Sequence, residues 1–576
     1  MSPRCVFAPR TCPRPWRMRK ARRAKLSPVS EISLIPLGGA GEIGKNITAL
    51  RQGDAILVVD AGLSFPTDEM HGVDIVIPDY TYLRENAEKV VGIVLTHGHE
   101  DHVGALPYIL SEVDVPVYGT ELTIALVKRK LNEPGRRVLG ELKTITPGEP
   151  FQAGPFEVEP IHMTHSLPQS CALAIRTAIG IVLFSGDFKI DFTPIDGKLS
   201  DIARLGELGD EGVTVLLSDC TNVEFAGWSP SERTVRAGFE RVFRSAEGRI
   251  IITTFASNLH RLQQAIDVSR QFGRKVAIAG RSMEQTTAIG RSLGIIRADD
   301  DILVSLDECE DISDSRLTIL ATGSQGEPMA ALNRIATDAH RQLYVKKGDT
   351  VIYSARPIPG NEAAIYQTIN RLFRQGANVV YGPDEGVHVS GHGYAEELRM
   401  LINLTRPDYI VPVHGEPRHV HHYLNLAEEM GYSEDSVVVM ENGMQLIVER
   451  DGARFGEPVP CGRILVDTAA VAGVPEETLR DRSTLARDGV IVITVAIDSD
   501  AGQVVGEPEV LARGVLTGDG ELDELRAVLK ATLASLTLPD LKDVTGVELR
   551  IDESARRYLR KQMRRYPMVV ASVVDV

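Results

Sequence analysis

The feature that most constrains this chain is a cluster of metal-binding side chains at residues 96–102, where the sequence is THGHEDH. The cluster follows the apolar run 90–95, which is typical of a buried strand. A tight loop after such a strand directs its side chains toward one point, and imidazole nitrogen with carboxylate oxygen suits zinc in a hydrolytic site. An ordinary polar helix start is the alternative interpretation. The HxH and DH pairs fall on opposite sides of the loop, which favours two metal ions.

Size and composition indicate a globular protein of several domains. At 576 residues the chain exceeds what one core accommodates, and 43% hydrophobic with 25% charged residues are ordinary values. Its longest apolar runs are far below the ~20 residues that span a bilayer, so no membrane segment is expected. The six cysteines form no CxxC pair, which predicts neither a disulfide framework nor a zinc ribbon and favours a cytoplasmic location. The net charge of −16 repels nucleic acid overall, so such a substrate would need local basic groups and metal charge.

Strand and helix patterns divide the chain into successive parts. Short apolar strands separated by turns predict a sheet sandwich flanked by helices, whereas regular strand–helix alternation predicts βαβ units and a parallel sheet. Ligand-type residues resume after the alternating region, and a glycine- and proline-rich segment follows. The expected parts are a disordered basic N-terminal extension (1–28), a first sandwich part (29–214), an α/β domain (215–380), a second part with ligand-type residues (381–450), a linker (451–463) and a C-terminal α+β domain (464–576).

Two local patterns predict particular helices. Residues 229–232 (SPSE) form a capping-box pattern with proline at the first helical position, which predicts a helix that runs to about Ser245. Near the C-terminus, basic residues recur in adjacent pairs every four residues, which predicts a helix with one basic face. The basic residues are Arg556, Arg557, Arg560, Lys561, Arg564 and Arg565, and the expected opposite, buried stripe is Leu559, Met563 and Tyr566. The basic face is interpreted either as solvated surface or as an RNA contact.

A glycine-rich phrase at residues 39–45 (GAGEIGK) allows more than one interpretation. It satisfies the spacing of a dinucleotide-binding motif and nearly satisfies a P-loop. However, Asn46 stands where a P-loop needs Ser or Thr for magnesium, and residues 47–50 continue as a strand, so no helix N-terminus is available for pyrophosphate. We therefore expect a tight turn beside the metal site.

Four more ligand-type residues stand at the ends of expected strands: Asp60, His165, Asp187 and His414. Taken alone, each is either a functional residue or an ordinary turn carboxylate or core histidine. Their order along the chain, with HxHxDH after Asp60, resembles the motif series of the metallo-β-lactamase fold. The α/β domain narrows the resemblance to the β-CASP nuclease branch. This resemblance implies an α/β fold class in which an αββα sandwich carries an inserted β-CASP domain and is followed by a small α+β domain.

Several phrases resemble the ribonuclease J family in particular, in order from about residue 30 to 450 and more loosely to the C-terminus. They are LGGAGEIGKN (37–46), SGDFKID (185–191), SDCTN (218–222), TTFASNLHR (253–261), TGSQGEP (322–328), HVSGH (388–392) and PVHGE (412–416). Three departures from the usual family residues, at Ser185, Gln169 and Cys220, leave the ligand set intact.

By position, the resemblance implies a site with two zinc ions and a bridging carboxylate. One zinc is assigned to His97, His99 and His165, the other to Asp101, His102 and His414, with Asp187 as the bridge and Asp60 orienting ligands from behind. The catalytic set implied is Asp101, Asp187, Asp219 and His392, the last two near the scissile phosphate. The substrate contacts implied are Ser257, Asn258, Gly323, Ser324, Gln325, Gly326, His388, Val389, Ser390, Gly391 and His392.

The resemblance implies a zinc-dependent ribonuclease that acts as a 5′-to-3′ exonuclease and an endonuclease in mRNA decay and rRNA maturation, leaving 5′-phosphate and 3′-hydroxyl ends. The neutral donors of the phrases HVSGH and TGSQGEP favour RNA with a 5′-monophosphate over a triphosphate. A homodimer or homotetramer through the C-terminal domain is also implied. The alternatives are a β-CASP nuclease that acts on DNA, a small-molecule hydrolase, for which the inserted domain has no use, and a non-catalytic binding module.

Overall fold

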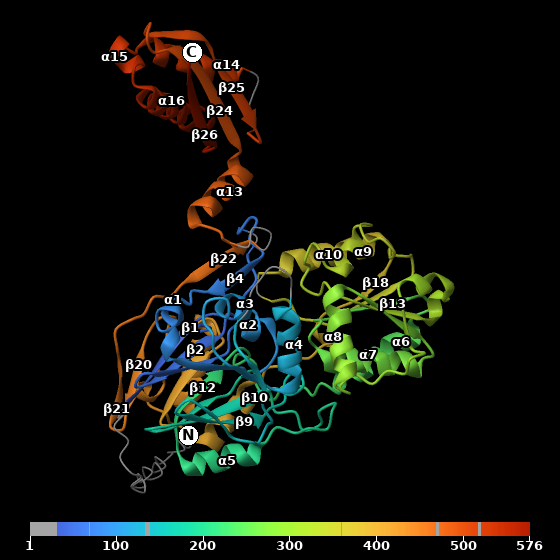
Figure 1. Cartoon of the computed structure of the whole chain (residues 1–576). Coiled ribbons are helices and arrows are strands. Elements are labelled where there is room, and N and C mark those ends of the chain that lie inside the picture. The colour runs from blue at the N-terminus through green and yellow to red at the C-terminus, as the bar shows by residue number, and fades with distance from the viewer. Residues whose placement is uncertain (1–30, 68, 133–138, 359, 468–471, 516–519) are drawn as a thin grey trace, which may run out of the picture.

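The computed structural model describes residues 31–67, 69–132, 139–358, 360–467, 472–515 and 520–576. The chain forms a sheet sandwich, an α/β domain beside it and a C-terminal unit that stands apart at the far end of helix α13 (Glu476–Asp488) (Figure 1). The expected N-terminal extension, residues 1–28, lies outside the described residues. Within the described ranges, no helix is both long and apolar enough to cross a bilayer.

Two sheets form the sandwich. The first has the order β21 (Gly452–Phe455), β20 (Leu446–Glu449), β1 (Glu31–Gly38), β2 (Ile47–Gln52), β3 (Ala55–Val59), β5 (Val90–Val94), β6 (Val117–Gly119) and β7 (Leu142–Thr144). The second has the order β19 (Tyr409–Val413), β12 (Val213–Asp219), β11 (Gly180–Phe184), β10 (Cys171–Thr177), β9 (Phe156–His162) and β8 (Phe151–Ala153). Both sheets contribute to one buried core, for example Leu57 and Val94 from the first and Leu173 from the second. Because many of these strands are buried on both faces, they appear in the sequence as continuous apolar runs.

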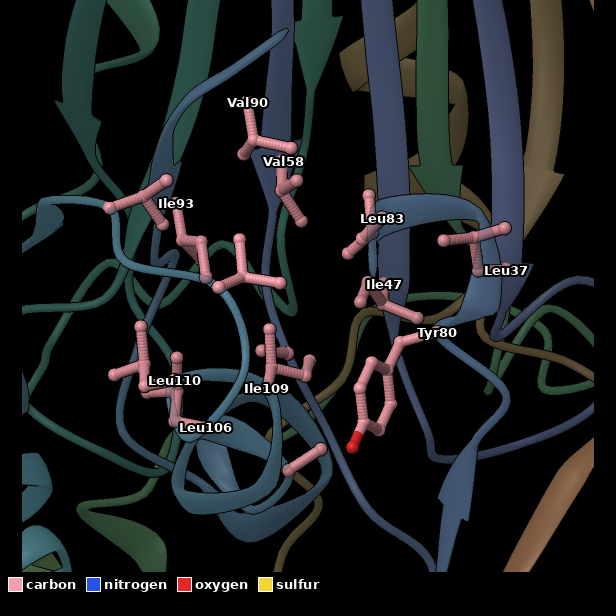
Figure 2. Close-up of a cluster of buried hydrophobic side chains, with 14 of the residues drawn as sticks. Leu37, Ile47, Val58, Tyr80, Leu83, Val90, Ile93, Leu106, Ile109 and Leu110 are labelled. Atoms are coloured by element: carbon pink, nitrogen blue, oxygen red, sulfur yellow. The ribbon is translucent and has the colours of Figure 1, made fainter. Parts of the chain in front are cut away.

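Helices cover the outer face of each sheet, which confirms the αββα order. The first sheet carries α1 (Thr81–Glu85), α2 (Glu100–Val103), α3 (Leu106–Ile109) and α4 (Glu121–Leu131), and the second carries α5 (Ile202–Glu211), α11 (Ala395–Thr405) and α12 (Pro417–Glu429). Figure 2 shows Leu106, Ile109 and Leu110 in the core that also contains Val58 and Ile93 of the first sheet. Each such buried side chain contributes about 1.5–3 kcal/mol of hydrophobic stabilisation.

The α/β domain is an insertion between two neighbouring strands of the second sheet. The chain leaves this sheet after β12 and returns at β19, which lies beside β12 in parallel register with Leu217 opposite Val411. β20 then pairs with β1, so the end of the sandwich closes against its beginning.

The inserted domain contains the predicted parallel sheet. Its strand order is β15 (Leu303–Val304), β14 (Lys275–Ala279), β16 (Leu317–Ala321), β13 (Ile250–Thr253), β17 (Thr350–Tyr353) and β18 (Asn378–Val380). Its helices are α6 (Thr234–Ser245), α7 (Leu259–Gln271), α8 (Arg281–Ser292), α9 (Ala331–Ala336) and α10 (Glu362–Arg374). Regular strand–helix alternation in the sequence therefore identified this domain correctly.

The helix predicted to begin at Pro230 begins at Thr234 instead. The Glu232 carboxylate accepts hydrogen bonds from Arg261 Nε and Nη2 at 2.6 and 2.9 Å, and Ser229 Oγ donates to Glu397. The capping-box prediction is wrong because a buried, long-range ion pair uses the glutamate that a local cap would need.

The C-terminal unit is a three-stranded sheet with helices on one face. The strand order is β25 (Gln503–Arg513), β24 (Val490–Asp498) and β26 (Met568–Asp575), and the helices are α14 (Glu521–Ala534), α15 (Leu538–Leu541) and α16 (Val544–Tyr558). A π-helical turn, Leu559–Met563, continues α16, and Arg564 ends it with φ 49°. Leu559 is buried as expected, but Arg564 and Arg565 lie beyond the helix and Tyr566 is 60% exposed. The prediction is wrong for these three positions because the helix ends earlier.

Three strands lie where the sequence predicted a linker and the start of the C-terminal domain. β21 falls within residues 451–463 and pairs with β20. β22 (Arg463–Asp467) pairs with β4 (Ile75–Pro78) of the sandwich part, and β23 (Ala472–Gly473) joins them as a third strand. The linker prediction is wrong for residues 452–455, because strand pairing continues past the glycines and prolines that suggested a break.

Candidate metal centre

The predicted ligands converge from the ends of several strands. His97 and His99 follow β5, Asp101 and His102 lie in α2, and His165, Asp187 and His414 follow β9, β11 and β19. These side chains form three overlapping groups, and within each group all ligand atoms lie within 4.8 Å of one another. The first group is His97, His99, His165 and Asp187, the second is Asp101, His102, Asp187 and His414, and the third is Asp187, Asp219, His392 and His414. The structure thus brings together all seven predicted ligands with Asp219 and His392. Asp187 belongs to every group.

The first group is rich in imidazole nitrogen. His97 Nε2 and His165 Nε2 lie 3.0 and 3.2 Å from His99 Nδ1. Asp187 Oδ2 lies 3.7 Å from His97 Nε2 and 3.9 Å from His165 Nε2. Burial lowers the pKa of all three histidines, that of His99 to about 4. Neutral imidazoles that direct their nitrogens at one point beside a carboxylate fit a divalent transition-metal ion.

The second group is rich in carboxylates. His102 Nε2 lies 3.2 Å from Asp187 Oδ2, and His414 Nε2 lies 3.1 Å from Asp101 Oδ2. Burial opposes protonation of both histidines, but Asp187 and the neighbouring carboxylates outweigh burial and raise the pKa of each, that of His414 to about 10. The positive charge that these histidines take up offsets buried negative charge. A divalent cation supplies the same compensation, so this donor set also fits a metal ion.

Asp60 lies behind the second group and orients it. Its Oδ2 is 2.8 Å from His102 Nδ1, and its Oδ1 accepts the backbone N–H of Thr96 at 2.8 Å. Because Nδ1 is thus held, Nε2 of His102 faces Asp187. Thr96 Oγ1 also lies 3.0 Å from His97 Nδ1, and Asn46 Nδ2 donates to the Asp101 carbonyl at 3.1 Å. Thr96 and Asn46 were not predicted as site residues, although Thr96 begins the THGHEDH cluster and Asn46 ends the LGGAGEIGKN phrase.

The glycine-rich phrase forms the expected turn beside this centre. The Gly39 carbonyl accepts the backbone N–H of His414 at 2.8 Å, and strand β2 follows the turn directly. Gly62, in the loop opposite, approaches Asp101 so closely that a Cβ would lie 1.6 Å from the Asp101 carbonyl oxygen. The absence of a side chain at this position is therefore a requirement of the metal centre.

Asp219 and His392 form a pair at the edge of the centre. Asp219 Oδ2 is 2.7 Å from His392 Nδ1, and Thr221 Oγ1 donates to Asp219 Oδ1 at 2.7 Å. With Nδ1 held in this way, His392 Nε2 lies 3.9 Å from Asp187 Oδ2. Burial opposes protonation of His392, but Asp219 and Asp187 raise its pKa overall. His392 can therefore hold a proton on the atom that faces the metal ligands.

The HVSGH segment, residues 388–392, is tied to both the metal centre and the inserted domain. The Gly391 carbonyl lies 2.8 Å from His165 Nδ1, and Ser390 Oγ accepts from Asn222 Nδ2 at 2.7 Å. His388 Nδ1 accepts from Arg261 Nη1 at 3.2 Å, and burial followed by the nearby Arg261 charge keeps the pKa of His388 well below its usual value. The Val389 carbonyl accepts from Arg261 Nη2 at 3.4 Å.

The other predicted substrate contacts lie close by, but several of their side chains already hold backbone groups. Asn258 Oδ1 caps α7 by accepting the backbone N–H of Arg261 at 3.0 Å. The Gln325 amide donates to the Arg356 carbonyl at 2.9 Å and accepts from Ile358 N at 2.7 Å. Ser324 is buried, Ser257 is half-buried, and Gly323 and Gly326 both have positive φ angles. A substrate contact from the side chain of Asn258 or Gln325 would therefore have to use an amide N–H that these hydrogen bonds leave over.

Two buried cations support the HVSGH segment and were missed as site residues. Arg261 is fully buried and pairs with Glu232, while its remaining donors reach residues 387–389. Lys189 Nζ donates to the Ser390 carbonyl at 3.2 Å and to the Pro230 carbonyl at 3.1 Å, and burial lowers the pKa of this lysine. Both residues stand inside the motif phrases SGDFKID and TTFASNLHR, which is the only signal that the sequence offers for them.

Family models match successive parts of the chain. A model described as the metallo-beta-lactamase superfamily matches residues 40–213, "Ribonuclease J, beta-CASP domain" matches 247–372, "Zn-dependent metallo-hydrolase RNA specificity domain" matches 384–439, and "Ribonuclease J C-terminal domain" matches 477–576. These matches follow the order of the parts that the fold displays.

Relatives that match over nearly the whole chain are also ribonuclease J proteins. Ribonuclease J of Synechocystis sp. is 42% identical over 95% of this chain and 87% of its own length, and ribonuclease J of Thermus thermophilus is 42% identical over 95% and 96%. Ribonuclease J of Mycolicibacterium smegmatis is 37% identical over 94% of this chain and 96% of its own. The chain belongs to the ribonuclease J family. It is a metal-dependent ribonuclease that binds RNA, and the predicted family and fold are confirmed.

A solved structure supports the fold alone. A protein of unknown function from Enterococcus faecalis V583 superposes on 73% of this chain, over 100% of its own length, with a TM-score of 0.52 and 16% identity.

Proposed function

We propose that this ribonuclease uses two zinc ions and digests RNA both from the 5′ end and internally, leaving 5′-phosphate and 3′-hydroxyl ends. The observation that carries the proposal is the position of Asp187, whose carboxylate lies between a group of three neutral histidines and a group of carboxylates and histidines. His97, His99 and His165 would hold one ion, and Asp101, His102 and His414 the other. Two such ions, when bound, activate a water molecule and stabilise the attacking and leaving oxygens of an in-line displacement.

The chain's own residues supply the proton for the leaving oxygen. Asp219 holds His392 Nδ1, so that Nε2 faces the metal ligands and carries the transferable proton. The raised pKa of His392 keeps that proton in place near neutral pH. Asp101 and Asp187 fix the ligands, and Asp60 keeps His102 in the required orientation.

For 5′-end-dependent cleavage, we propose that residues 388–392 with Ser257 and the turn 323–326 hold the terminal monophosphate. Ser390 Oγ accepts from both Asn222 Nδ2 and the backbone N–H of His392, so its own proton can be donated to a phosphate oxygen. His388, which burial and the nearby Arg261 charge keep uncharged, lies two residues from Ser390 and is the second side chain that we assign to this pocket. Neutral donors of this kind suit a compact monophosphate.

We further propose that the enzyme forms dimers or tetramers through its C-terminal unit. On the β25–β24–β26 sheet, one face packs on α14 and α16, while the other exposes apolar side chains such as Val505, Leu511, Val570 and Val574. A second copy of the unit would cover this face. The substrates we propose are messenger and ribosomal RNA in the cytoplasm, and the free thiols of the four described cysteines agree with a reducing compartment.

The central test is digestion of one RNA, labelled at its 3′ end, that carries either a 5′-monophosphate or a 5′-triphosphate, beside a DNA strand of the same sequence. We expect processive shortening of the monophosphorylated RNA, internal cuts in both RNAs and little cleavage of DNA. Elemental analysis of the purified enzyme should find about two zinc ions per chain, as a two-metal hydrolase requires. Full activity of a metal-free preparation would overturn the proposal.

A further inference from the structure

A stack of two aromatic rings and one guanidinium lies beside the HVSGH segment. The Phe225 and Tyr394 rings are stacked, with centroids 5.1 Å apart and planes at 29°. The guanidinium carbon of Arg356 lies 5.3 Å from the Phe225 centroid, and Arg356 Nη2 lies 3.5 Å from Tyr394 Oη. Phe225 is 43% exposed, so the stack is part of the accessible surface.

The stack is fixed directly to the active site. Tyr394 follows His392 by two residues, and the Phe225 carbonyl accepts the backbone N–H of Ala395 at 3.0 Å. The Arg356 carbonyl accepts from Gln325 Nε2 at 2.9 Å, which joins it to the turn 323–326. Arg356 follows strand β17 of the inserted domain, whereas Tyr394 is the N-cap of α11, which packs on the second sheet, so the stack joins the two parts.

The charge of Arg356 is not neutralised locally. The buried arginines Arg249 and Arg261 pair with Asp349 and Glu232. By contrast, no carboxylate in the described ranges forms an ion pair with Arg356, although the chain as a whole carries a net charge of −16. An arginine held on aromatic rings, with its planar fork not used by an acid, can bind a phosphate with two hydrogen bonds.

We propose that Arg356, which lies over the Phe225 ring and contacts Tyr394 Oη, is an additional phosphate-binding residue for single-stranded RNA beside the active site. The inference rests on the proposed RNA-degrading function and extends it. The phrases HVSGH and TGSQGEP offer only neutral donors, whereas Arg356 supplies a full positive charge from a segment outside them. The exposed Phe225 ring adds a surface on which a base can stack, as in other single-strand binding sites.

The test measures RNA binding by metal-free protein, so that cleavage does not interfere. Fluorescence anisotropy with a short, labelled single-stranded RNA is recorded over a range of salt concentrations for the wild type, Arg356→Gln and Arg356→Lys. The matched control is Arg374→Gln, which removes the same charge from an exposed position at the far end of α10 in the same domain. Melting temperatures of all variants verify that they are folded.

We expect Arg356→Gln to weaken binding about ten-fold and to lower the slope of log affinity against log salt by about 0.7, the value for one phosphate contact with a single strand. Arg356→Lys should keep most of the salt slope but lose affinity, because lysine retains the charge without the planar fork. Phe225→Leu should give an intermediate loss, since it removes the ring that positions the guanidinium.

Two RNAs, one with a 5′-monophosphate and one with a 5′-hydroxyl, identify which phosphate is bound. An equal loss for both assigns Arg356 to a backbone phosphate, and a loss confined to the monophosphorylated RNA assigns it to the terminal phosphate; either result supports the proposal. If Arg356→Gln binds both RNAs like Arg374→Gln, the proposal is wrong while the proposed ribonuclease function stands. If the wild type neither binds nor cleaves RNA, the function itself is wrong.

Discussion

The metal side and the RNA-end side of this active site are held in different ways. On the metal side, side chains from the ends of β5, β9, β11 and β19 meet directly, and strand pairing within the sandwich fixes their positions. On the RNA-end side, the backbone carbonyls of residues 389, 390 and 392 are held by Arg261 from the inserted domain, by Lys189 and by Asn222.

The geometry of the two sides therefore depends on different parts of the molecule. The metal side depends on the register of strands inside one core, so its geometry should survive changes elsewhere in the chain. The RNA-end side depends on buried cations that bridge the sandwich and the inserted domain, so it should fail when the packing between these parts is disturbed. Substitutions on the two sides should therefore have different signatures.

The largest effect is expected for the residue shared by all ligand groups. Asp187→Ala should reduce cleavage of every RNA, whatever its 5′ end, by roughly 10⁴-fold or more, and should lower the metal content of the purified protein. Single-turnover cleavage and elemental analysis measure the two effects. Asp196→Asn, a change at an exposed aspartate, is the control. Retained metal and activity in Asp187→Ala would remove the basis for a bridging carboxylate.

The next largest effect is expected on the RNA-end side, where substitution of Arg261 should lower the stability of the protein. Arg261→Met leaves the Glu232 carboxylate buried without its partner, which should lower the free energy of unfolding by about 3–5 kcal/mol. The double change Arg261→Met/Glu232→Met should cost much less, since no uncompensated charge remains. Urea denaturation measures both. A single variant as stable as the wild type would show that the ion pair does not hold the inserted domain against residues 387–389.

The metal side was predictable from the sequence because most of its proposed ligands lie close together along the chain. The cluster of residues 96–102 contains four of the seven proposed ligands, and the remaining three each follow an apolar strand. Donor type also identifies metal chemistry without knowledge of the fold. The strand patterns were equally informative, since the parallel sheet and the sandwich follow directly from apolar runs and their spacing.

The RNA-end side was predictable only in part, because long-range contacts decide it. Glu232 has the spacing of a capping residue, yet it pairs with Arg261, which is 29 positions away. Asn258 and Gln325 stand in the right phrases, yet their side chains hold backbone groups. Nothing in the sequence indicates that Arg356 lies near Phe225 and Tyr394, because the three residues come from separate segments. The predicted helix start at Pro230 was wrong for the same reason.

A smaller effect on the metal side should come from Asp60. Asp60→Asn replaces the carboxylate that orients His102, and loss of such an orienting group typically lowers metal affinity about 10- to 100-fold. A competition titration with a zinc chelator measures this affinity. We expect cleavage to recover at high metal concentration, whatever the 5′ end of the RNA. An unchanged affinity would show that strand register alone orients His102.

The sharpest comparison between the two sides concerns Ser390, where the effect should be confined to one of the two modes of cleavage. Ser390→Ala removes a hydroxyl whose proton is available for a phosphate oxygen, because both contacts of this oxygen in the described chain are accepted ones. Loss of one charged hydrogen bond, worth roughly 1.5–3 kcal/mol, should slow 5′-end-dependent digestion by about ten- to a hundred-fold. Internal cleavage should change much less. The readout is the ratio of the two rates on one labelled RNA, with Ser292→Ala on the surface of α8 as the control.

The ratio matters because Ser390 lies next to Gly391, whose carbonyl contacts His165 on the metal side. If the two sides are independent, the ratio of end-dependent to internal cleavage falls while metal content stays constant. If both rates fall equally and metal content drops, the HVSGH segment positions His165 rather than the RNA end. The segment would then belong to the metal side, and the 5′-phosphate pocket would have to lie elsewhere, for which Arg356, beside the exposed Phe225 ring, is a positively charged candidate.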